Sequence, residues 1–318
     1  MNKYEHNAPM LPSFFVIGPP RTGTSWLHEV LKQHTSLPHH IKETRFFDEH
    51  FHRGLDWYLR YFSRNGQRQR GEVAPTYFAS SEARERIART ISEAKVVCIF
   101  RHPVERAKSL YRLKFAYGMV REGFEEALQC DPELVESGKY ATHLKAWRKA
   151  VGMSRILVTF YERLRDDPQQ YVDELADCIG LSRFKLTAEQ IRFVHGSEAL
   201  TQPRQYASTC IAVALANRLK SRHLDRMVMA LRTSRLGKLF LSGGRPFMRV
   251  SPEASNVALQ IFRREVEELE QMLNVDLSDW KSVGSEDAEL PIEELAPSET
   301  STATIHNLRK AEIPDQAA

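Results

Sequence analysis

The sequence predicts an α/β fold in which a central parallel β-sheet is flanked by helices. Three short apolar runs, at residues 14–17, 96–100 and 156–160, are rich in Phe, Val and Ile. Each run is followed at once by polar or glycine residues and then by a helix-like pattern. This alternation is typical of strands that are buried on both faces and joined by crossover helices.

The segments between and after these runs carry apolar residues at helical spacing. The last segment shows the pattern over the greatest length, because Val257, Ile261, Val266 and Leu269 recur about one or two turns apart on one face. The predicted helices span residues 25–33, 55–62, 81–91, 103–117, 140–150, 169–179 and 252–273.

The composition is that of a globular protein with room for a full core. The chain has 318 residues, 42% hydrophobic and 27% charged, with a net charge of +4. Positions 283–318 hold eight acids and two bases, so the rest of the chain is strongly basic and should favour anionic ligands. We predict one domain over residues 1–282, with a basic helical insertion at about 203–243, and a disordered acidic tail over 283–318.

Two further features of the composition bear on location and metals. No apolar run reaches the ~18 residues of a membrane span, and the first residues do not resemble a secretory signal, so we expect a cytoplasmic protein. The four cysteines lie far apart, which fits neither a disulfide framework nor a paired metal site. We predict no bound metal, because His34, His39, His40, His50 and His52 lack metal-ligand spacing.

A glycine-bounded loop follows the first predicted strand and opens a helix. It begins Gly18-Pro19-Pro20-Arg21 and continues Thr22-Gly23-Thr24-Ser25-Trp26. Backbone N–H groups of such a loop, together with the positive end of the helix dipole, bind phosphate groups. The loop matches the nucleotide-triphosphatase pattern G-x-x-x-x-G-K-[ST] except that Thr24 replaces the lysine. Hydrolysis of ATP or GTP is therefore disfavoured, and Arg21 is the cation available inside the loop.

A second anion-binding pair follows the second predicted strand. Arg101 stands where that strand ends, and Ser109 lies eight residues later on the next predicted helix. An arginine and a serine so placed can reach one phosphate from two sides, the first by charge-assisted hydrogen bonds.

These two segments resemble the sulfotransferases that use 3′-phosphoadenosine 5′-phosphosulfate (PAPS). The motifs are most similar to those of the heparan-sulfate-type and related bacterial enzymes, and they run from about residue 14 to residue 280. The further matching segments are residues 42–47 (K-E-x-x-F-F), 54–58 (G-[IL]-x-W-Y), 72–78 (E-K-[TS]-P-x-Y-F), 140–147 (Y-x-x-H-x-x-x-W) and 244–245 (the end of K-G-R).

The resemblance implies a P-loop nucleotide-binding fold with PAPS as donor and adenosine 3′,5′-bisphosphate (PAP) as product. It places the 5′-phosphosulfate on the first loop, the 3′-phosphate on Arg101 and Ser109, and the adenine near Trp26. No metal is required. The implied cofactor-binding residues are Pro20, Arg21, Thr22, Gly23, Thr24, Ser25, Trp26, Arg101, Ser109, Gly244 and Arg245.

Three residues are predicted to act in catalysis. Glu43 occupies the family's base position and lies where the chain returns to the sheet after the first helix, so it is predicted to take the acceptor's proton. Arg21 is predicted to stabilise the phosphosulfate. His143, on a helical face with Tyr140 and Trp147, is the second candidate for a base; a core histidine is the competing interpretation.

The predicted acceptor-binding residues are Lys42, Tyr77, Tyr140, His143 and Trp147. Three lysines of the family pattern are replaced, by Arg21, Val73 and Gly243. The two uncharged replacements, Val73 and Gly243, reduce the positive charge expected around the cleft. We therefore expect a small, partly apolar acceptor, such as a glycolipid or metabolite, rather than a long anionic polysaccharide.

The sequence thus predicts a sulfotransferase that moves a sulfuryl group from PAPS to an acceptor hydroxyl, or an amine, of a carbohydrate, lipid or small metabolite. One alternative is a P-loop nucleotide kinase. Another is a non-catalytic module that binds membrane or nucleic acid through the basic stretch at 203–250. Few aromatic residues are available there for base stacking, so no nucleic-acid partner is expected, whereas peripheral membrane contact is compatible with the pattern.

Overall fold

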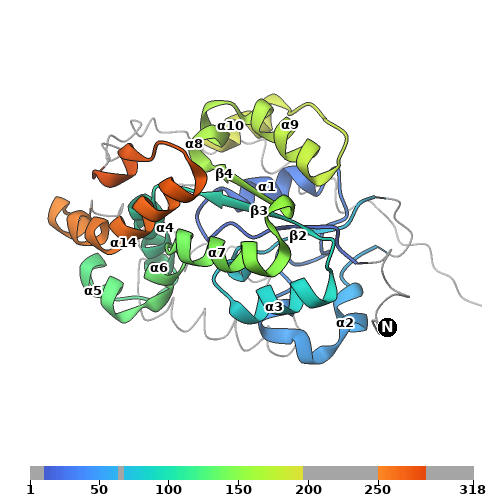
Figure 1. The fold of residues 1–318 in the computed structure, drawn as a ribbon, viewed down its shortest axis with the longest axis horizontal. Helices are drawn as coiled ribbons and strands as arrows, with labels where there is room; N and C mark the ends of the chain where they lie inside the picture. Colours follow the sequence, from blue (N-terminus) through green and yellow to red (C-terminus); the bar gives the residue numbers. More distant parts are fainter. Residues whose placement is uncertain (1–10, 64–67, 196–249, 284–318) are drawn as a thin grey trace, which may run out of the picture. The chain divides into compact units, whose positions relative to one another are not determined.

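The structure, a computed structural model, describes residues 11–63, 68–195 and 250–283. Within them, four parallel strands form one sheet in the order β2-β1-β3-β4 (Figure 1). The strands are β1 (Phe14–Val16), β2 (Gly71–Val73), β3 (Lys95–Phe100) and β4 (Ile156–Phe160). The predicted α/β fold with a parallel sheet flanked by helices is confirmed.

Strand β2 is the one strand of this sheet that the hydrophobic pattern did not predict. It is three residues long, and Glu72 at its centre is fully buried. Its register pairs Glu72 with Phe15 of β1. A strand this short, with glycine and glutamate in two of its three positions, carries no apolar run, so its place in the sheet depends on tertiary contacts.

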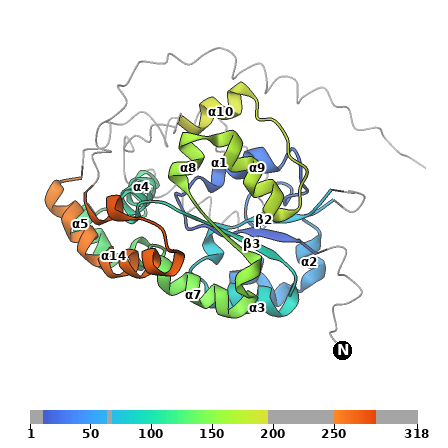
Figure 2. The same ribbon diagram turned by 45° about the horizontal axis from the view of Figure 1, so that its top comes forward.

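One face of the sheet is covered by α1 (Thr24–Leu31), α8 (Tyr161–Asp166), α9 (Pro168–Ile179) and α10 (Ala188–His195) (Figures 1 and 2). Phe14 and Val16 point to this face and pack in one apolar cluster with Leu27 of α1 and Leu175 of α9. Burial of such side chains, at about 1.5–3 kcal/mol each, holds the helices against the sheet.

The opposite face receives Phe15 and Ile17, as the two-residue period of a strand requires. It is covered by the π-helical turn η2 (Phe46–His50), the 3-10 turns η3 (Phe51–Arg53) and η4 (Pro75–Tyr77), and the helices α2 (Leu55–Leu59), α3 (Ser81–Thr90) and α7 (Tyr140–Val151). The 3-10 turn η5 (Met153–Arg155) joins α7 to β4. Figures 1 and 2 both show α2, α3 and α7 on the side away from α9.

A third apolar cluster forms beside the sheet. It joins α4 (Pro103–Ala116), α5 (Phe124–Cys130), α6 (Pro132–Glu136) and α14 (Pro252–Leu273), and the 3-10 turn η6 (Ser278–Lys281) follows α14. Phe262 of α14 packs against α4 and α5 in this cluster. The short helices α5, α6, α8 and α10 were not predicted, because each has fewer than the ~12 residues over which helical periodicity is distinct.

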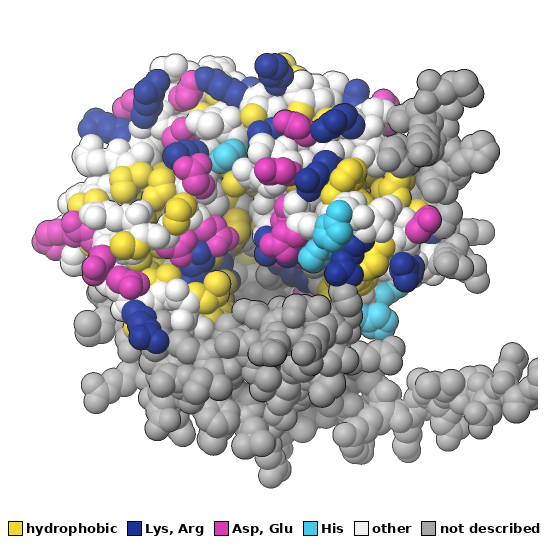
Figure 3. All heavy atoms as spheres, turned by 90° about the horizontal axis from the view of Figure 1, so that it is seen from below, with side chains coloured by type: hydrophobic (Ala, Val, Ile, Leu, Met, Phe, Trp, Pro, Cys, Tyr) yellow, Lys and Arg dark blue, Asp and Glu magenta, His cyan; other side chains and the backbone are white. Residues whose placement is uncertain are grey.

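The face seen in Figure 3 carries basic and acidic side chains side by side. Ion pairs also form within and between the helices. Arg89 lies 3.4 Å from Glu85 on α3, and Lys145 of α7 contacts Glu268 of α14. Exposed pairs of this kind contribute little to stability and leave no single-sign field among these partners.

The described residues belong to one compact unit. The predicted basic insertion at about 203–243, and the predicted acidic tail apart from Val283, lie outside the described residues. Across the described ranges, no helix is both long and apolar enough to cross a membrane.

Candidate active site

The phosphate loop joins β1 to α1 at the carboxyl edge of the sheet. Arg21 (φ 75°) and Gly23 (φ 88°) both have left-handed backbones, a geometry that gathers N–H groups into an anion-binding concavity. Buried Thr22 donates from Oγ1 to the carbonyl oxygen of Pro19 at 2.8 Å and closes the loop. A Cβ at Gly18 would lie 2.7 Å from the backbone nitrogen of Ile99, so glycine allows the loop to approach β3.

Two predicted phosphate-binding segments meet at this loop. The Nε of Arg21 donates to the Oγ of Ser109 at 2.9 Å, although the two residues are 88 positions apart. Arg101 directs its Nη1 towards the carbonyl oxygen of Arg21 at 3.5 Å. The structure therefore brings Arg21, Arg101 and Ser109 into one cluster.

The electrostatics of this cluster suit an anion. Burial lowers the pKa of Arg21, and the charge of Arg101 lowers it further. An anion placed beside both guanidinium groups would relieve this repulsion and accept charge-assisted hydrogen bonds.

Tyr161, the first residue after β4, supports the same cluster. The guanidinium carbon of Arg101 lies 4.7 Å from the centre of the Tyr161 ring, within the range of a cation–π interaction. A Cβ at Gly23 would lie 3.1 Å from a carbon of the same ring. Tyr161 thus packs against the phosphate loop and also fixes the direction of Arg101.

A second cluster of polar and charged side chains forms at the start of α1. Lys42 donates from Nζ to the Oγ of Ser25 at 3.1 Å, and its Nζ lies 3.5 Å from Oε1 of Glu43. Ser25 is in the first turn of α1, so Lys42 connects the helix N-terminus with Glu43. Burial lowers the pKa of Lys42, Glu43 opposes this, and the charge of Arg21 lowers it again, which places the two clusters within electrostatic reach of each other.

Glu43 has the electrostatics of a general base. Its side chain is 22% exposed, and burial raises its pKa above that of an ordinary glutamate, while Lys42 and Arg45 act in the opposite direction. A carboxylate with a raised pKa binds a proton more strongly. The exposed part of the side chain allows an acceptor to reach it.

The side chain of Glu72 contacts Thr44, the residue that follows Glu43. Its Oε1 accepts hydrogen bonds from the backbone N and from Oγ1 of Thr44, at 2.8 and 2.7 Å, and its Oε2 accepts one from the hydroxyl of Tyr58 at 2.8 Å. The hydroxyl of Tyr77 lies 3.3 Å from Oε2. Burial raises the pKa of Glu72 to about 7, against the effect of these donors.

The predicted residues of α7 lie in the core beside the strand ends. Tyr140 stacks on Phe100 and donates from its hydroxyl to the carbonyl oxygen of Arg101 at 2.9 Å. Trp147 is fully buried, and its Nε1 donates to the carbonyl oxygen of Phe78 at 2.9 Å. These contacts explain both side chains by packing, and the acceptor contacts predicted for them stay predictions.

His143 lies on the same helix, away from the two clusters of charged side chains described above. Its ring packs against Phe78, and its Nε2 lies 3.0 Å from the carbonyl oxygen of Glu136. Burial lowers the pKa of His143, which favours the neutral ring. The core interpretation accounts for these contacts, and its predicted catalytic role is not tested by them.

The remaining predicted cofactor residues differ in exposure. Trp26 is buried against the apolar cluster of α1, and its Nε1 donates to the carbonyl oxygen of Gln190 in α10 at 2.8 Å. Thr24 is buried, whereas Ser25 is exposed and Pro20 is partly exposed. The predicted contact of Trp26 with adenine stays a prediction, and Gly244 and Arg245 lie outside the described residues.

Two residues of this site were not singled out by the sequence for the positions they take. Tyr161 was missed because its nearness to Arg101 depends on β3 and β4 being neighbours. Glu72 was recognised as part of a motif, but nothing in the sequence joined it to Thr44, which lies 28 positions earlier. In the part of the chain that the structure describes, no His, Cys, Asp and Glu side chains gather as a metal site.

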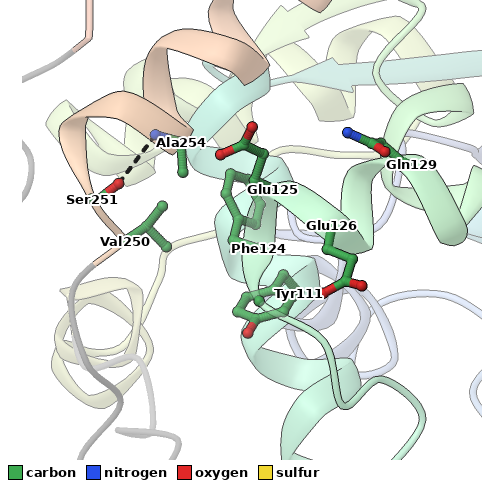
Figure 4. A pocket seen from close by; sticks show the side chains of 9 residues that line it. Tyr111, Phe124, Glu125, Glu126, Gln129, Val250, Ser251 and Ala254 are labelled. Atoms are coloured by element: carbon green, nitrogen blue, oxygen red, sulfur yellow. Dashed lines mark hydrogen bonds between the residues drawn. The ribbon is translucent and has the colours of Figure 1, made fainter.

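A separate cavity of about 500 Å³ opens between α4, α5 and the start of α14 (Figure 4). Its polar side chains are acidic or neutral, which does not suit a phosphate-bearing ligand. We therefore place the candidate site at the strand ends. The cavity is lined by Tyr111, Gly123, Phe124, Glu125, Glu126, Gln129, Val250, Ser251 and Ala254.

Solved structures include a protein with the same fold. The sulfotransferase from Alicyclobacillus acidocaldarius aligns with a TM-score of 0.60 at 21% identity, covering 85% of this chain and 99% of that one. At this level of identity the likeness concerns the fold.

Sequence comparison identifies the family. The chain is 29% identical over 207 residues to the bifunctional heparan sulfate N-deacetylase/N-sulfotransferase 4 of Mus musculus, which covers 58% of this chain and 24% of that protein. It is 29% identical over 201 residues to the corresponding enzyme 3 of Homo sapiens, covering 56% and 23%. The chain thus spans about a quarter of the length of these relatives. The sulfotransferase domain model matches residues 11–208, more than half of the chain, and the protein therefore belongs to the sulfotransferase domain family.

Proposed function

We propose that this protein transfers a sulfuryl group from PAPS to a hydroxyl or amine group of its acceptor. The observation that carries the proposal is the joining of two clusters at the sheet edge. Arg21, Arg101 and Ser109 form the anion-binding side, and Lys42 and Glu43 form the reacting side. Membership of the sulfotransferase family supports the same reaction.

The residues of the anion-binding side fit the donor. A 3′-phosphate needs cations and a hydroxyl, which Arg101 and Ser109 supply, and a 5′-phosphosulfate needs the N–H groups of a loop at a helix N-terminus. Thr24 is 3% exposed and carries no charge, so it cannot replace the lysine with which a nucleotide kinase holds the terminal phosphates. This supports PAPS over ATP as the donor.

In the proposed reaction the acceptor oxygen or nitrogen forms a bond to sulfur as the bond from sulfur to the phosphate oxygen breaks. Glu43 accepts the proton that the acceptor loses. Arg21 and Lys42 stabilise the negative charge that develops on the departing phosphate oxygen, and PAP leaves with that electron pair. Sulfuryl transfer thus depends mainly on positioning and on charge stabilisation.

Lys42 has a particular role in this proposal. The sulfotransferase motif E-K-[TS]-P has a lysine where this chain has Val73, and Val73 is fully buried among apolar side chains. The end of β2 therefore supplies no cation. Lys42, which touches both Ser25 and Glu43, is the cation nearest to the base in the described site.

For the acceptor we propose a hydroxyl or amine of a carbohydrate, lipid or small metabolite. The names of the relatives, heparan sulfate N-sulfotransferases, support a carbohydrate amine. The loss of the lysine at Val73 supports a less anionic acceptor than a long sulfated polysaccharide. The basic stretch at 203–250, whose pattern is compatible with peripheral membrane contact, lies outside the described residues.

The first test measures ligand binding and turnover together. PAP should bind at least about tenfold more tightly than ADP, because only PAP carries the 3′-phosphate for Arg101 and Ser109. Labelled PAPS should pass its label to one member of a panel containing N-deacetylated heparan-like polysaccharide and amphiphilic glycolipids. Equal affinity for PAP, ADP and single-stranded DNA, with no transfer, would exclude the proposed function.

Replacing Lys42 by Met should lower turnover by about 10- to 100-fold, because the shape of the side chain is kept while its charge at the reacting group is lost. The affinity for PAP should fall as well, because PAP keeps the phosphate oxygen whose negative charge Lys42 stabilises, so turnover is compared at saturating PAPS. Lys42 favours the ionised form of Glu43, so its removal should raise the pKa of Glu43. The acid limb of the pH–rate profile should then move to higher pH.

The matched control is Lys32→Met, which removes an exposed lysine beyond the end of α1 that pairs with Glu29. It should leave turnover and the pH profile unchanged. A Lys42→Met enzyme with normal turnover would show that another cation stabilises the departing group.

A further inference from the structure

The buried carboxylate of Glu72 is the centre of a closed hydrogen-bond network. Its two oxygens accept hydrogen bonds from Thr44, Tyr58 and Tyr77. These residues come from the segment after α1, from α2 and from η4. The network extends further, because Oγ1 of Thr44 accepts from the backbone N of Phe46 at 3.1 Å. A fully buried carboxylate with this many donors is held in one orientation.

We propose that Glu72 is a positioning residue for the base: it holds the peptide group between Glu43 and Thr44 and so sets the place of Glu43. The inference rests on the proposed function of Glu43. Neither the family resemblance nor the geometry of the phosphate loop assigns this role to Glu72.

Glu72 is linked to the base through the peptide group between Glu43 and Thr44. The N–H that Glu72 accepts at 2.8 Å belongs to Thr44, and it is therefore part of the peptide group that joins Glu43 to Thr44. The chain turns sharply here, because Arg45 has a left-handed backbone with φ 52°. Since Glu72 lies in β2, which pairs with β1, the network ties the base to the strand that leads into the phosphate loop.

Glu72 and Glu43 are carboxyl groups on adjacent segments, and two such groups disfavour each other's ionised form. Burial and, to a smaller degree, Glu43 raise the pKa of Glu72 to about 7. Below that pH Glu72 is largely neutral, so it acts on Glu43 mainly through position. Tyr58 and Tyr77 face Glu72 with phenols whose pKa values lie well above the usual range, so both stay protonated and donate. Lys42 and Arg45 face Glu43 and lower its pKa, whereas Asp48 raises it.

The experiment replaces Glu72 by Gln, which keeps the size of the side chain and leaves it one acceptor oxygen in place of two. Because the pKa of Glu72 is about 7, its carboxyl is already largely neutral at lower pH, so the pKa of Glu43 should stay close to its wild-type value. The Glu43 carboxyl is followed by carbon NMR on glutamate-labelled protein, with Glu43→Gln identifying the signal, and its chemical shift should change because the adjoining peptide group is held less firmly. PAPS turnover should fall by about 10- to 100-fold, as for other residues that orient a catalytic group, while the acid limb of the pH–rate profile and the affinity for PAP stay close to those of the wild type.

The control variant is Glu265→Gln. Glu265 accepts from the backbone N and from Oγ1 of Thr142, at 3.0 and 2.5 Å, which repeats the contact of Glu72 with Thr44 at an exposed position. It should leave both the Glu43 carboxyl signal and turnover as in the wild type. Glu72→Asp, whose shorter side chain moves the carboxyl group away from Thr44, should lower turnover as well.

The outcomes separate this inference from the proposed function. Unchanged turnover together with an unchanged Glu43 carboxyl signal in Glu72→Gln would overturn the positioning role. A loss of PAP affinity as large as the loss of turnover would overturn it too, because Glu72 would then support the fold in general. If wild-type protein transferred no sulfuryl group while the Glu43 signal still shifted in Glu72→Gln, the proposed function would fail and the positioning of Glu43 by Glu72 would stand.

Discussion

Replacing Glu43 by Gln is expected to lower turnover by about 100-fold or more, because glutamine cannot accept the proton that the acceptor loses. The affinity for PAP should stay within about twofold of the wild-type value, since Glu43 belongs to the reacting side of the site. Turnover is measured with labelled PAPS, and affinity is measured by calorimetry with PAP.

The wild-type pH–rate profile should report the same residue. Glu43 acts as a base only when ionised, so activity should rise as the pH passes upward through its pKa. Burial raises that pKa, which should place the acid limb above the ~4.3 of an ordinary glutamate.

Glu49→Gln is the matched control for this experiment. Glu49 is an exposed carboxylate in η2, where it lies 2.8 Å from Arg45. Its replacement should leave turnover unchanged. A Glu43→Gln enzyme with nearly full activity would contradict the assignment of the base, and His143 would then be tested next.

Replacing Arg101 by Ala should weaken PAP binding by about 10- to 100-fold, the loss expected when charge-assisted hydrogen bonds of ~1.5–3 kcal/mol are removed. Binding of adenosine 5′-phosphate should hardly change, because this ligand has no 3′-phosphate. The ratio of the two affinities is therefore the quantity to measure.

Arg163→Ala tests whether loss of any nearby arginine has the same effect. Arg163 lies on α8, two residues after Tyr161, and pairs with Glu174 at 2.6 Å. It should leave the affinity for PAP unchanged. Equal losses of PAP and adenosine 5′-phosphate in Arg101→Ala would assign Arg101 to another part of the nucleotide.

The elements that the sequence predicts best are those whose pattern is complete within one segment. The apolar runs that became β1, β3 and β4 show burial on both faces without any knowledge of the partners. Strand β2 could not be found in this way, because Glu72 replaces an apolar residue at its centre. Its burial is possible only because Thr44, Tyr58 and Tyr77 satisfy its carboxylate.

The candidate site was predictable to the extent that its residues stand in motifs. Arg21, Arg101 and Ser109 were predicted to share one ligand, and the structure brings them together. The contact of Arg101 with Tyr161 depends on the order of the strands, which the local sequence does not contain. The helical face of α7 was recognised from its spacing, but spacing alone cannot distinguish side chains that bind an acceptor from side chains that fill a core.

The segment that ends the described part of the chain also bears on how the anion site is completed during synthesis. Trp280 packs against Tyr140 and Phe160, and the Nε2 of His102 lies 3.1 Å from the carbonyl oxygen of Ser282. His102 caps α4, the helix that carries Ser109. A growing chain emerges from the ribosome in sequence order, so the support behind Arg101 is complete only after residue 282 has emerged. Nascent chains shorter than this have both arginines with Ser109 and Tyr161, but they lack the contacts that Trp280 and Ser282 make with Tyr140, Phe160 and His102.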